Sequence, residues 1–261
     1  MFVNPVKQRL RDGKNIINGW LHIPSPLTAE AMAHVGFDSL TLDLQHGPFG
    51  FEAVLPMLQA ITGTQTVPMA RVPWNEPGII MKLLDAGCYG LICPMVSTPE
   101  QCEAFVGACK YPPLGYRSFG PTRVRLHAGD SYAEVANQEI FTLAMIETAE
   151  ALTNLDDIMA VPGLDGIYVG PADLSQALGG TPGADWLDGP VVEALERILE
   201  MAQQRDIVAG IHTMSVAYAR RMLDFGYRFV TVQSDLSLLI SSAKATVSGV
   251  TQDRSTAPAP Y

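Results

Sequence analysis

The stretch Phe141-Thr-Leu-Ala-Met-Ile-Glu147 is an apolar run that ends at a carboxylate, and Gly166-Ile-Tyr-Val-Gly-Pro-Ala-Asp173 repeats this pattern. Each run has the length and composition of a buried strand. The intervening residues 148–164 have the apolar period of a helix. A strand, a helix and a parallel strand place Glu147 and Asp173 side by side at one edge of a sheet. Two carboxylates at such an edge favour the binding of a hard divalent cation.

Apolar strand-like runs and amphipathic helical segments alternate along the whole chain of 261 residues. The expected strands are 16–23, 39–44, 67–72, 90–95, 142–146, 166–169, 207–211 and 229–232. The expected helices are 28–34, 51–60, 77–86, 99–109, 152–159, 190–205, 216–225 and 236–248. Eight such units within about 250 residues predict an α/β protein with a (β/α)₈ TIM barrel.

The barrel is expected to form a single domain over residues 1–250. Residues 251–261 are rich in Pro, Ala, Ser and Thr and are expected to form a flexible tail. A doubly wound sheet is the alternative fold, but it gives no reason for eight units, and no Gly-x-Gly-x-x-Gly follows the first strand. Segment 111–139 is the longest irregular stretch, which indicates a functional lid or a subunit contact.

Composition and charge exclude several classes of protein. The net charge of −10 opposes binding to nucleic acid or to an anionic membrane. No apolar run approaches the ~20 residues that a membrane span needs, and the polar amino terminus lacks a signal peptide, so a cytoplasmic protein is expected. The four cysteines, Cys88, Cys93, Cys102 and Cys109, form no Cys-x-x-Cys pair and are expected to be reduced, packed thiols rather than a zinc site or disulfides.

Polar residues follow several of the expected strands, at the edge where TIM barrels carry their active sites. They are Asp43, Gln45 and His46 after the second strand, Arg71 after the third, Glu147 after the fifth, Asp173 and Ser175 after the sixth, and His212 and Thr213 after the seventh. Each residue alone has a structural explanation, as a helix cap, an ion-pair partner or a core histidine. Their joint occurrence at the strand ends predicts an enzyme.

The residue types indicate the chemistry of an enolate. A cation held by only two carboxylates leaves positions open for a 2-oxo acid, whose ketone it would polarise. Arg71 can neutralise charge on the same oxygen, and His46 can transfer a proton near neutral pH, directly or through a water. The backbone N–H groups of Ala172 and Asp173 are placed to receive a substrate carboxylate. A Schiff base is the competing route, but no lysine (Lys7, Lys14, Lys82, Lys110, Lys244) lies at an expected strand end.

Seven segments between Gly19-Trp20 and the last helix carry a resemblance to a known family. They are Asp43-Leu-Gln-His46-Gly, Ala70-Arg71-Val, Lys82-Leu-Leu-Asp85-Ala-Gly, Pro94-Met-Val, Tyr111-Pro-Pro-x-Gly-x-Arg117, Ile146-Glu147-Thr and Gly170-Pro-Ala-Asp173-Leu. In these segments the chain resembles the HpcH/HpaI aldolases, the metal-dependent (class II) pyruvate aldolases, among them 4-hydroxy-2-oxoheptanedioate aldolase. The match covers nearly the whole chain.

The resemblance implies roles for individual residues. Glu147 and Asp173 would bind Mg²⁺ or Mn²⁺, with Co²⁺ as a third candidate, and Ala172 and Asp173 would hold the pyruvate carboxylate. His46 resembles the base and Arg71 the transition-state stabiliser. Asp85 resembles the acid that raises the basicity of His46. It is expected at the end of the helix 77–86, from which it can reach His46 only across a subunit interface or if this helix ends at another residue, and a surface acid is its alternative role.

The resemblance also implies an activity and an assembly. The expected activity is a carbon–carbon lyase that reversibly cleaves 4-hydroxy-2-oxo acids to pyruvate and an aldehyde, with a place in aromatic compound catabolism. The expected assembly is a homo-hexamer, a trimer of dimers, in which the C-terminal helix swaps between subunits. The alternatives are an oxaloacetate-type decarboxylase, a CoA-thioester lyase and a catalytically silent barrel. Gln45 and Met145 stand where family members often have Glu and Gln, and the roles of His212 and Arg117 are left open.

Overall fold

The computed structural model describes residues 2–256, with the backbone alone for 252–256. Eight parallel strands form a closed barrel in chain order, with the last strand hydrogen-bonded to the first. The strands are β1 (Ile16–Leu21), β2 (Ser39–Asp43), β3 (Val67–Arg71), β4 (Gly90–Cys93), β5 (Phe141–Ile146), β6 (Gly166–Val169), β7 (Val208–Thr213) and β8 (Phe229–Ser234). The predicted (β/α)₈ barrel is therefore confirmed.

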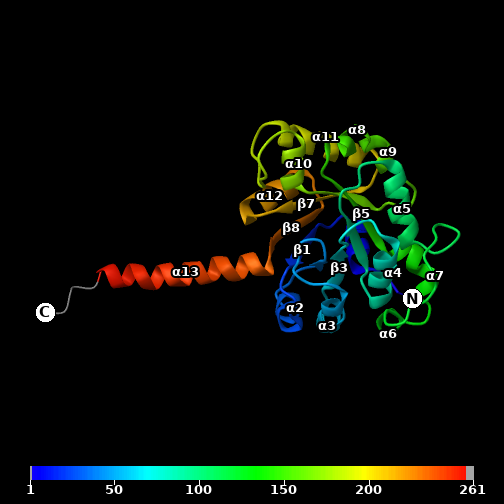
Figure 1. Cartoon of the computed structure of the whole chain (residues 1–261), viewed down its shortest axis with the longest axis horizontal. Coiled ribbons are helices and arrows are strands. Elements are labelled where there is room, and N and C mark those ends of the chain that lie inside the picture. Colours follow the sequence, from blue (N-terminus) through cyan, green and yellow to red (C-terminus); the bar gives the residue numbers. More distant parts are fainter. Residues whose placement is uncertain (1, 257–261) are drawn as a thin grey trace.

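The helices between the strands surround the barrel (Figure 1). They are α2 (Pro26–Ala33), α3 (Phe51–Thr62), α4 (Pro77–Ala86), α5 (Pro99–Cys109), α8 (Ala149–Thr153), α9 (Leu155–Met159), α10 (Pro171–Ala177), α11 (Pro190–Gln204) and α12 (Val216–Phe225). Two of them, α2 and α5, begin at a hydroxyl cap followed by proline; the side chain of Thr98 before α5 accepts a hydrogen bond from the N–H of Gln101. No helix of the described residues is both long and apolar enough to cross a membrane.

Two expected segments differ from the structure in the helices they contain. The helix expected at 152–159 is two short helices, α8 and α9, because Asn154 ends the first helix and precedes the second. Segment 111–139 is irregular only in its first half, since α6 (Arg125–Ala128) and α7 (Tyr132–Glu139) follow. Helix α7 buries Tyr132 and Ala136 against the core. Its sequence is largely polar and does not predict this tertiary contact.

The apolar side chains form two cores. The larger core lies between the barrel and its helices, and it includes the four cysteines, which are buried and unpaired as expected. Burial raises the pKa of Cys88, Cys102 and Cys109 to about 12, so these thiols stay protonated. The smaller core fills the barrel interior with side chains such as Trp20 and Tyr168. The barrel is therefore a packed scaffold, and a cavity can form only at an end.

An additional helix, α1 (Pro5–Arg11), closes the amino-terminal end of the barrel. It was not expected from the sequence, where the amino terminus is polar. Its buried residues Val6 and Leu10 join the barrel-interior core. Asn4 caps this helix, with its Oδ1 accepting a hydrogen bond from Val6 N at 3.0 Å.

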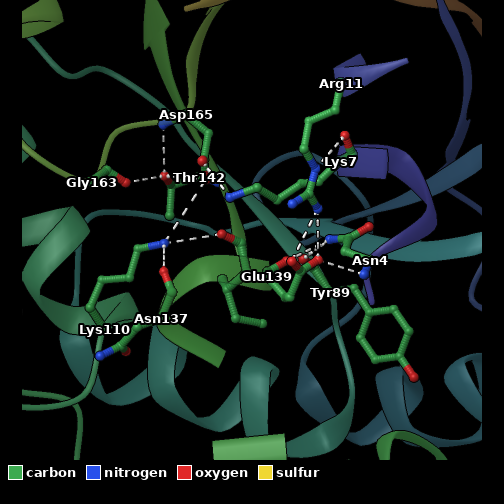
Figure 2. Close-up of polar contacts among 11 residues, drawn as sticks. Asn4, Lys7, Arg11, Tyr89, Lys110, Asn137, Glu139, Thr142, Gly163 and Asp165 are labelled. Atoms are coloured by element: carbon green, nitrogen blue, oxygen red, sulfur yellow. Dashed lines mark hydrogen bonds and ion pairs between the residues drawn. The ribbon is translucent and has the colours of Figure 1, made fainter. Parts of the chain in front are cut away.

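Polar contacts hold α1 against the barrel (Figure 2). Both Glu139 carboxylate oxygens accept hydrogen bonds from Arg11 at 3.0 Å, and one of them also accepts from Asn4 N at 2.7 Å. Lys7 pairs with Asp165, whose other oxygen accepts from Thr142 N. These pairs hold α1 across the amino-terminal end of the barrel. The active sites of TIM barrels lie at the opposite, carboxyl-terminal end.

The last helix, α13 (Asp235–Thr256), extends away from the barrel (Figure 1). It continues past residue 250, beyond which the sequence predicts a flexible tail, and residues 235–257 contain no proline that would interrupt a helix. Residues 257–261 of that expected tail lie outside the described residues. Large apolar side chains on α13 are exposed, namely Leu236, Leu238, Leu239, Ile240, Val247 and Val250. Exposed apolar side chains on one helix are typical of an element that packs against another subunit.

Candidate active site

The carboxyl ends of the strands enclose a cavity of about 290 Å³. Its lining residues are Trp20, His22, His46, Arg71, Met145, Glu147, Tyr168, Gly170, Pro171, Ala172, Asp173, Ala184, His212 and Met214. The predicted site residues His46, Arg71, Glu147, Ala172 and Asp173 are all among them, whereas Asp85 is not. None of the lysines lines this cavity, which agrees with the argument against a Schiff base.

Arg71 is held at the cavity wall by Asp43, the last residue of β2. Asp43 is fully buried, and its carboxylate accepts hydrogen bonds from Arg71 Nε at 2.8 Å and Nη2 at 2.6 Å. Such a two-point pair fixes the plane of the guanidinium. The guanidinium also lies 4.9 Å from the centre of the Trp20 ring, at cation–π distance. The Arg71 guanidinium is therefore held in one position, from which it can stabilise a negative charge on a ligand in the cavity.

Asp43 has a second partner, His22, whose Nε2 lies 2.8 Å from Oδ2. Burial acts to raise the pKa of Asp43, but the hydrogen bonds of His22 and Arg71 outweigh burial and hold this pKa well below its ordinary value. The sequence pattern predicts a strand over residues 16–23, which contains His22 and gives it no functional role. Strand β1 ends at Leu21, and a histidine directly after the apolar run is the signal that could have revealed it.

Glu147 directly follows β5 and is almost completely buried, at 2% exposure. Its Oε1 accepts a hydrogen bond from Met95 N at 2.7 Å, whereas Oε2 has no hydrogen-bond partner among the described residues. Burial raises the pKa of Glu147 to about 7, the charge of Asp173 acts in the same direction, and the Met95 N–H and Arg71 oppose them. A buried carboxylate oxygen without a donor fits a site for a cation.

Asp173 lies one turn into α10 rather than at the end of β6, and its side chain is exposed. The N–H groups of Ala172 and Asp173 belong to the first turn of this helix, where no intrahelical acceptor exists. Gly170 precedes the helix, and a Cβ atom at this position would overlap Glu147 Oε2. Glycine at this position therefore leaves room for the Glu147 carboxylate where it lies.

His46 and Asp85 are not brought together within one chain. His46 is exposed, and its ring forms no hydrogen bond with the described residues, although its backbone N–H donates to Asp43 Oδ1 at 3.3 Å. Asp85 is in α4 and accepts a hydrogen bond from Arg117 Nη2 at 2.6 Å. Arg117 is fully buried and also donates to Tyr132 Oη at 3.0 Å. Asp85 thus contacts a structural arginine, and within one chain it does not line the cavity.

His212, whose role was left open, lies in β7 and lines the cavity. Its Nδ1 is 3.1 Å from Tyr168 Oη, which donates to Thr231 at 2.7 Å. Burial lowers the pKa of His212 to about 4, and the charge of Arg71 adds to this effect, so the ring is neutral at neutral pH. His212 is thus a neutral polar group in an otherwise largely apolar part of the wall.

Met145 and Gln45, the two residues that depart from the family pattern, both lie close to the predicted site residues. Met145 lines the cavity beside Glu147, where an amide would have offered a polar contact. Gln45 adjoins the base candidate His46, and its Oε1 is buried without a hydrogen-bond partner in the described part of the chain. The cavity wall next to the carboxylates is therefore more apolar than the resemblance implies.

Comparisons with known proteins agree with this arrangement. The sequence model of the HpcH/HpaI aldolase/citrate lyase family matches residues 17–242. A hydroxypyruvate/pyruvate aldolase of Rhizorhabdus wittichii is 41% identical over 245 residues, which cover 94% of this chain and 98% of that protein. A 5-keto-4-deoxy-D-glucarate aldolase of Escherichia coli is 36% identical over 250 residues, with 94% and 95% covered. A solved HpcH/HpaI aldolase/citrate lyase family protein of Burkholderia cenocepacia superimposes with a TM-score of 0.88 at 32% identity, with 95% and 99% covered.

Proposed function

The chain belongs to the HpcH/HpaI aldolase/citrate lyase family, and on this premise we propose that it is a pyruvate aldolase. It is a carbon–carbon lyase that reversibly cleaves 4-hydroxy-2-oxo acids to pyruvate, or to hydroxypyruvate, and an aldehyde. The observation that carries the proposal is the meeting of His46, Arg71, Glu147 and Asp173 at one cavity. Relatives named as hydroxypyruvate/pyruvate aldolase and pyruvate aldolase support this choice of substrate.

Glu147 and Asp173 are the residues that would hold a divalent cation, Mg²⁺, Mn²⁺ or Co²⁺. The buried Oε2 of Glu147 has no donor among the described residues, and the oxygen-only donor pair suits a hard cation. Two carboxylates leave further coordination positions for a ligand. When bound, the cation supplies a Lewis acid for the 2-oxo group of the substrate.

The remaining residues have distinct tasks in the cleavage. Arg71, fixed by Asp43, stabilises the negative charge that develops on the oxo oxygen as the carbon–carbon bond breaks. His46 takes the proton from the C4 hydroxyl of the substrate as the C3–C4 bond breaks and the aldehyde forms, and a proton added to C3 of the other fragment completes pyruvate; the addition reaction runs these proton transfers in reverse. The N–H groups of Ala172 and Asp173 receive the substrate carboxylate. In these assignments, Ala172 and Asp173 bind the substrate carboxylate at one end of the cavity, and His46 transfers the proton at another side of it.

Removal of divalent cations tests the proposal directly. Pyruvate release from a 4-hydroxy-2-oxo acid is expected to cease after exhaustive chelation and to return when Mg²⁺ or Mn²⁺ is added. Pyruvate can be measured continuously with a coupled dehydrogenase. The same assay with oxaloacetate measures decarboxylation, and a much faster release from oxaloacetate would favour the decarboxylase alternative. Full activity in chelated enzyme would contradict the metal-dependent mechanism.

We further propose that α13 swaps between subunits of a homo-hexamer. The exposed apolar side chains of α13 support this assembly. It would allow Asp85 of a neighbouring subunit to approach His46, whose ring has no hydrogen bond within the described chain.

Deletion of residues 238–261 is expected to lower the oligomeric state, because it removes most of the exposed apolar face of α13. Size-exclusion chromatography with light scattering measures the molar mass of the particle. The cut leaves Asp235 in place, since this residue accepts hydrogen bonds from the backbone N–H groups of His22 and Ile23, which follow β1. A shortened chain with an unchanged molar mass would show that α13 does not hold the assembly together.

A further inference from the structure

His22 lies across the cavity from the carboxylates assigned to the cation. In the closed strand order, β1 is four strands away from β5, so the residues that follow these two strands face each other across the barrel mouth. His22 follows β1 and Glu147 follows β5, and both line the same cavity of about 290 Å³. A substrate whose 2-oxo acid end lies at Glu147 therefore directs its other end toward the side of His22.

Two independent contacts fix His22. Its Nε2 is 2.8 Å from Asp43 Oδ2, and its backbone N–H donates to Asp235 Oδ1 at 2.8 Å. The other oxygen of Asp235 accepts from Ile23 N at 3.1 Å, so the turn after β1 is held as a unit. A side chain that is held in this way can form a hydrogen bond to a ligand with little loss of conformational entropy.

The partner of Nε2 determines what the other ring nitrogen can do. Asp43 is ionised beside Arg71 and can only accept hydrogen bonds, so Nε2 of His22 carries a proton. In the neutral ring, Nδ1 then has a lone pair and is an acceptor. Nδ1 points away from Asp43, and no hydrogen bond from the described residues reaches it. The side chain is 28% exposed and lines the cavity, so this acceptor is open to a ligand.

Few other groups on this side of the cavity could receive a hydroxyl group. The neighbouring lining side chains Trp20, Ala184 and Met214 offer no strong acceptor. His46 and His212 are the other histidines of the lining: His46 is assigned to the C4 hydroxyl, and His212 donates from Nδ1 to Tyr168 Oη and keeps Nε2 as an acceptor on the side of β7. A further hydroxyl group of the substrate on the side of β1 is therefore most readily satisfied by His22.

We propose that His22 is a specificity-determining residue whose Nδ1 accepts a hydrogen bond from a hydroxyl group of the substrate. This inference rests on the proposed aldolase function and names the substrate class that the site prefers, which is hydroxylated. The hydroxyl group has two chemical sources. It belongs either to the three-carbon donor, as in hydroxypyruvate, or to the aldehyde, as in glycolaldehyde.

The test compares four aldol additions with Mg²⁺, which combine pyruvate or hydroxypyruvate with acetaldehyde or glycolaldehyde. Wild type, His22→Phe, His22→Gln and the exposed control His34→Phe are compared by kcat/KM. In His22→Phe, the preference for a hydroxylated over a non-hydroxylated substrate is expected to fall about tenfold, as for the loss of one buried hydrogen bond. In His22→Gln, part of the preference is retained, because an amide can both donate to Asp43 and accept from a hydroxyl. His34→Phe is expected to keep the wild-type preference.

The pattern of loss identifies the source of the hydroxyl group. A fall in the hydroxypyruvate-to-pyruvate ratio assigns it to the donor, and a fall in the glycolaldehyde-to-acetaldehyde ratio assigns it to the aldehyde. Equal losses in all four reactions would overturn the inference, because His22 would then act only by holding Asp43 and Arg71. If the phenylalanine variant does not fold, His22→Ala gives the same ratios. A wild-type enzyme without product in any combination would overturn the aldolase function and this inference together, whereas a product with unchanged ratios overturns the inference alone.

Discussion

Replacement of Glu147 by glutamine is expected to lower metal-stimulated pyruvate release by about 10³-fold or more, through loss of an anionic metal ligand. The side chain keeps its shape, and its remaining oxygen can still accept the hydrogen bond from Met95 N. What it loses is the negative charge at Oε2, which has no other partner in the described structure. Calorimetric titration with Mn²⁺ is expected to show binding to wild type and none to Glu147→Gln.

Glu147→Gln is expected to fold normally, so a lower activity of this variant reports the loss of metal binding and not unfolding. Burial disfavours the charged form of Glu147, so a neutral amide is expected to leave the melting temperature unchanged or higher in the absence of metal. Glu150→Gln is the matched control, because Glu150 is an exposed acid on α8. Glu150→Gln is expected to retain wild-type activity. Unaltered Mn²⁺ affinity in Glu147→Gln would refute the assignment of this residue as a ligand.

Replacement of Asp43 by alanine is expected to destabilise the protein by about 3–5 kcal/mol, the usual effect of removing one partner of a buried ion pair. Arg71 would be left buried without its carboxylate, and His22 would lose the acceptor of its Nε2–H. Pyruvate release is expected to fall by about 10²-fold or more, since Arg71 would no longer be held where charge develops. Denaturant titration measures the stability, and the coupled assay measures the activity.

An exposed ion pair provides the control for this experiment. Asp156 lies 2.6 Å from Arg205 and is 66% exposed, so Asp156→Ala is expected to change the stability by less than about 1 kcal/mol. Asp43→Asn keeps the shape of the side chain and removes the charge, and it is expected to fall between wild type and Asp43→Ala in stability. If Asp43→Ala and Asp156→Ala unfold at the same denaturant concentration, Asp43 does not organise the site as described.

Much of the barrel could be predicted from the sequence because each strand is a short apolar run. A strand end that is misplaced by one or two residues does not change the topology. In the site, the same misplacement changes which residues are recognised as strand-end residues. Strand β1 was expected to continue to residue 23, so His22 was not recognised as a strand-end residue, although it contacts Asp43. Asp173 was expected at a strand end and lies in a helix turn, yet it still reaches the cavity because β6 ends only a few residues earlier.

Other features had no local signal. Helix α1 closes the barrel with two apolar residues in a polar segment, and α7 is stabilised by packing of Tyr132 rather than by its own pattern. The contact of Asp85 with Arg117 joins residues 32 positions apart, which no spacing rule predicts. Such pairings depend on how segments pack, and they are specified by the whole chain.

The sequence by itself determined the class of fold, the order of the strands and the positions of Glu147 and Asp173, the carboxylates that follow β5 and β6. It could do so because the hydrophobic period and the chain direction are local properties. It also determined that a histidine, an arginine and two acids share one edge. The tertiary structure alone decided which of them touch. Asp43 fixes both Arg71 and His22, Glu147 keeps one oxygen without a donor, and Asp85 lies away from His46. The physical reason is that hydrogen bonding, burial and pKa depend on distances of a few ångströms between segments that are distant in the chain, and these distances exist only after the barrel closes.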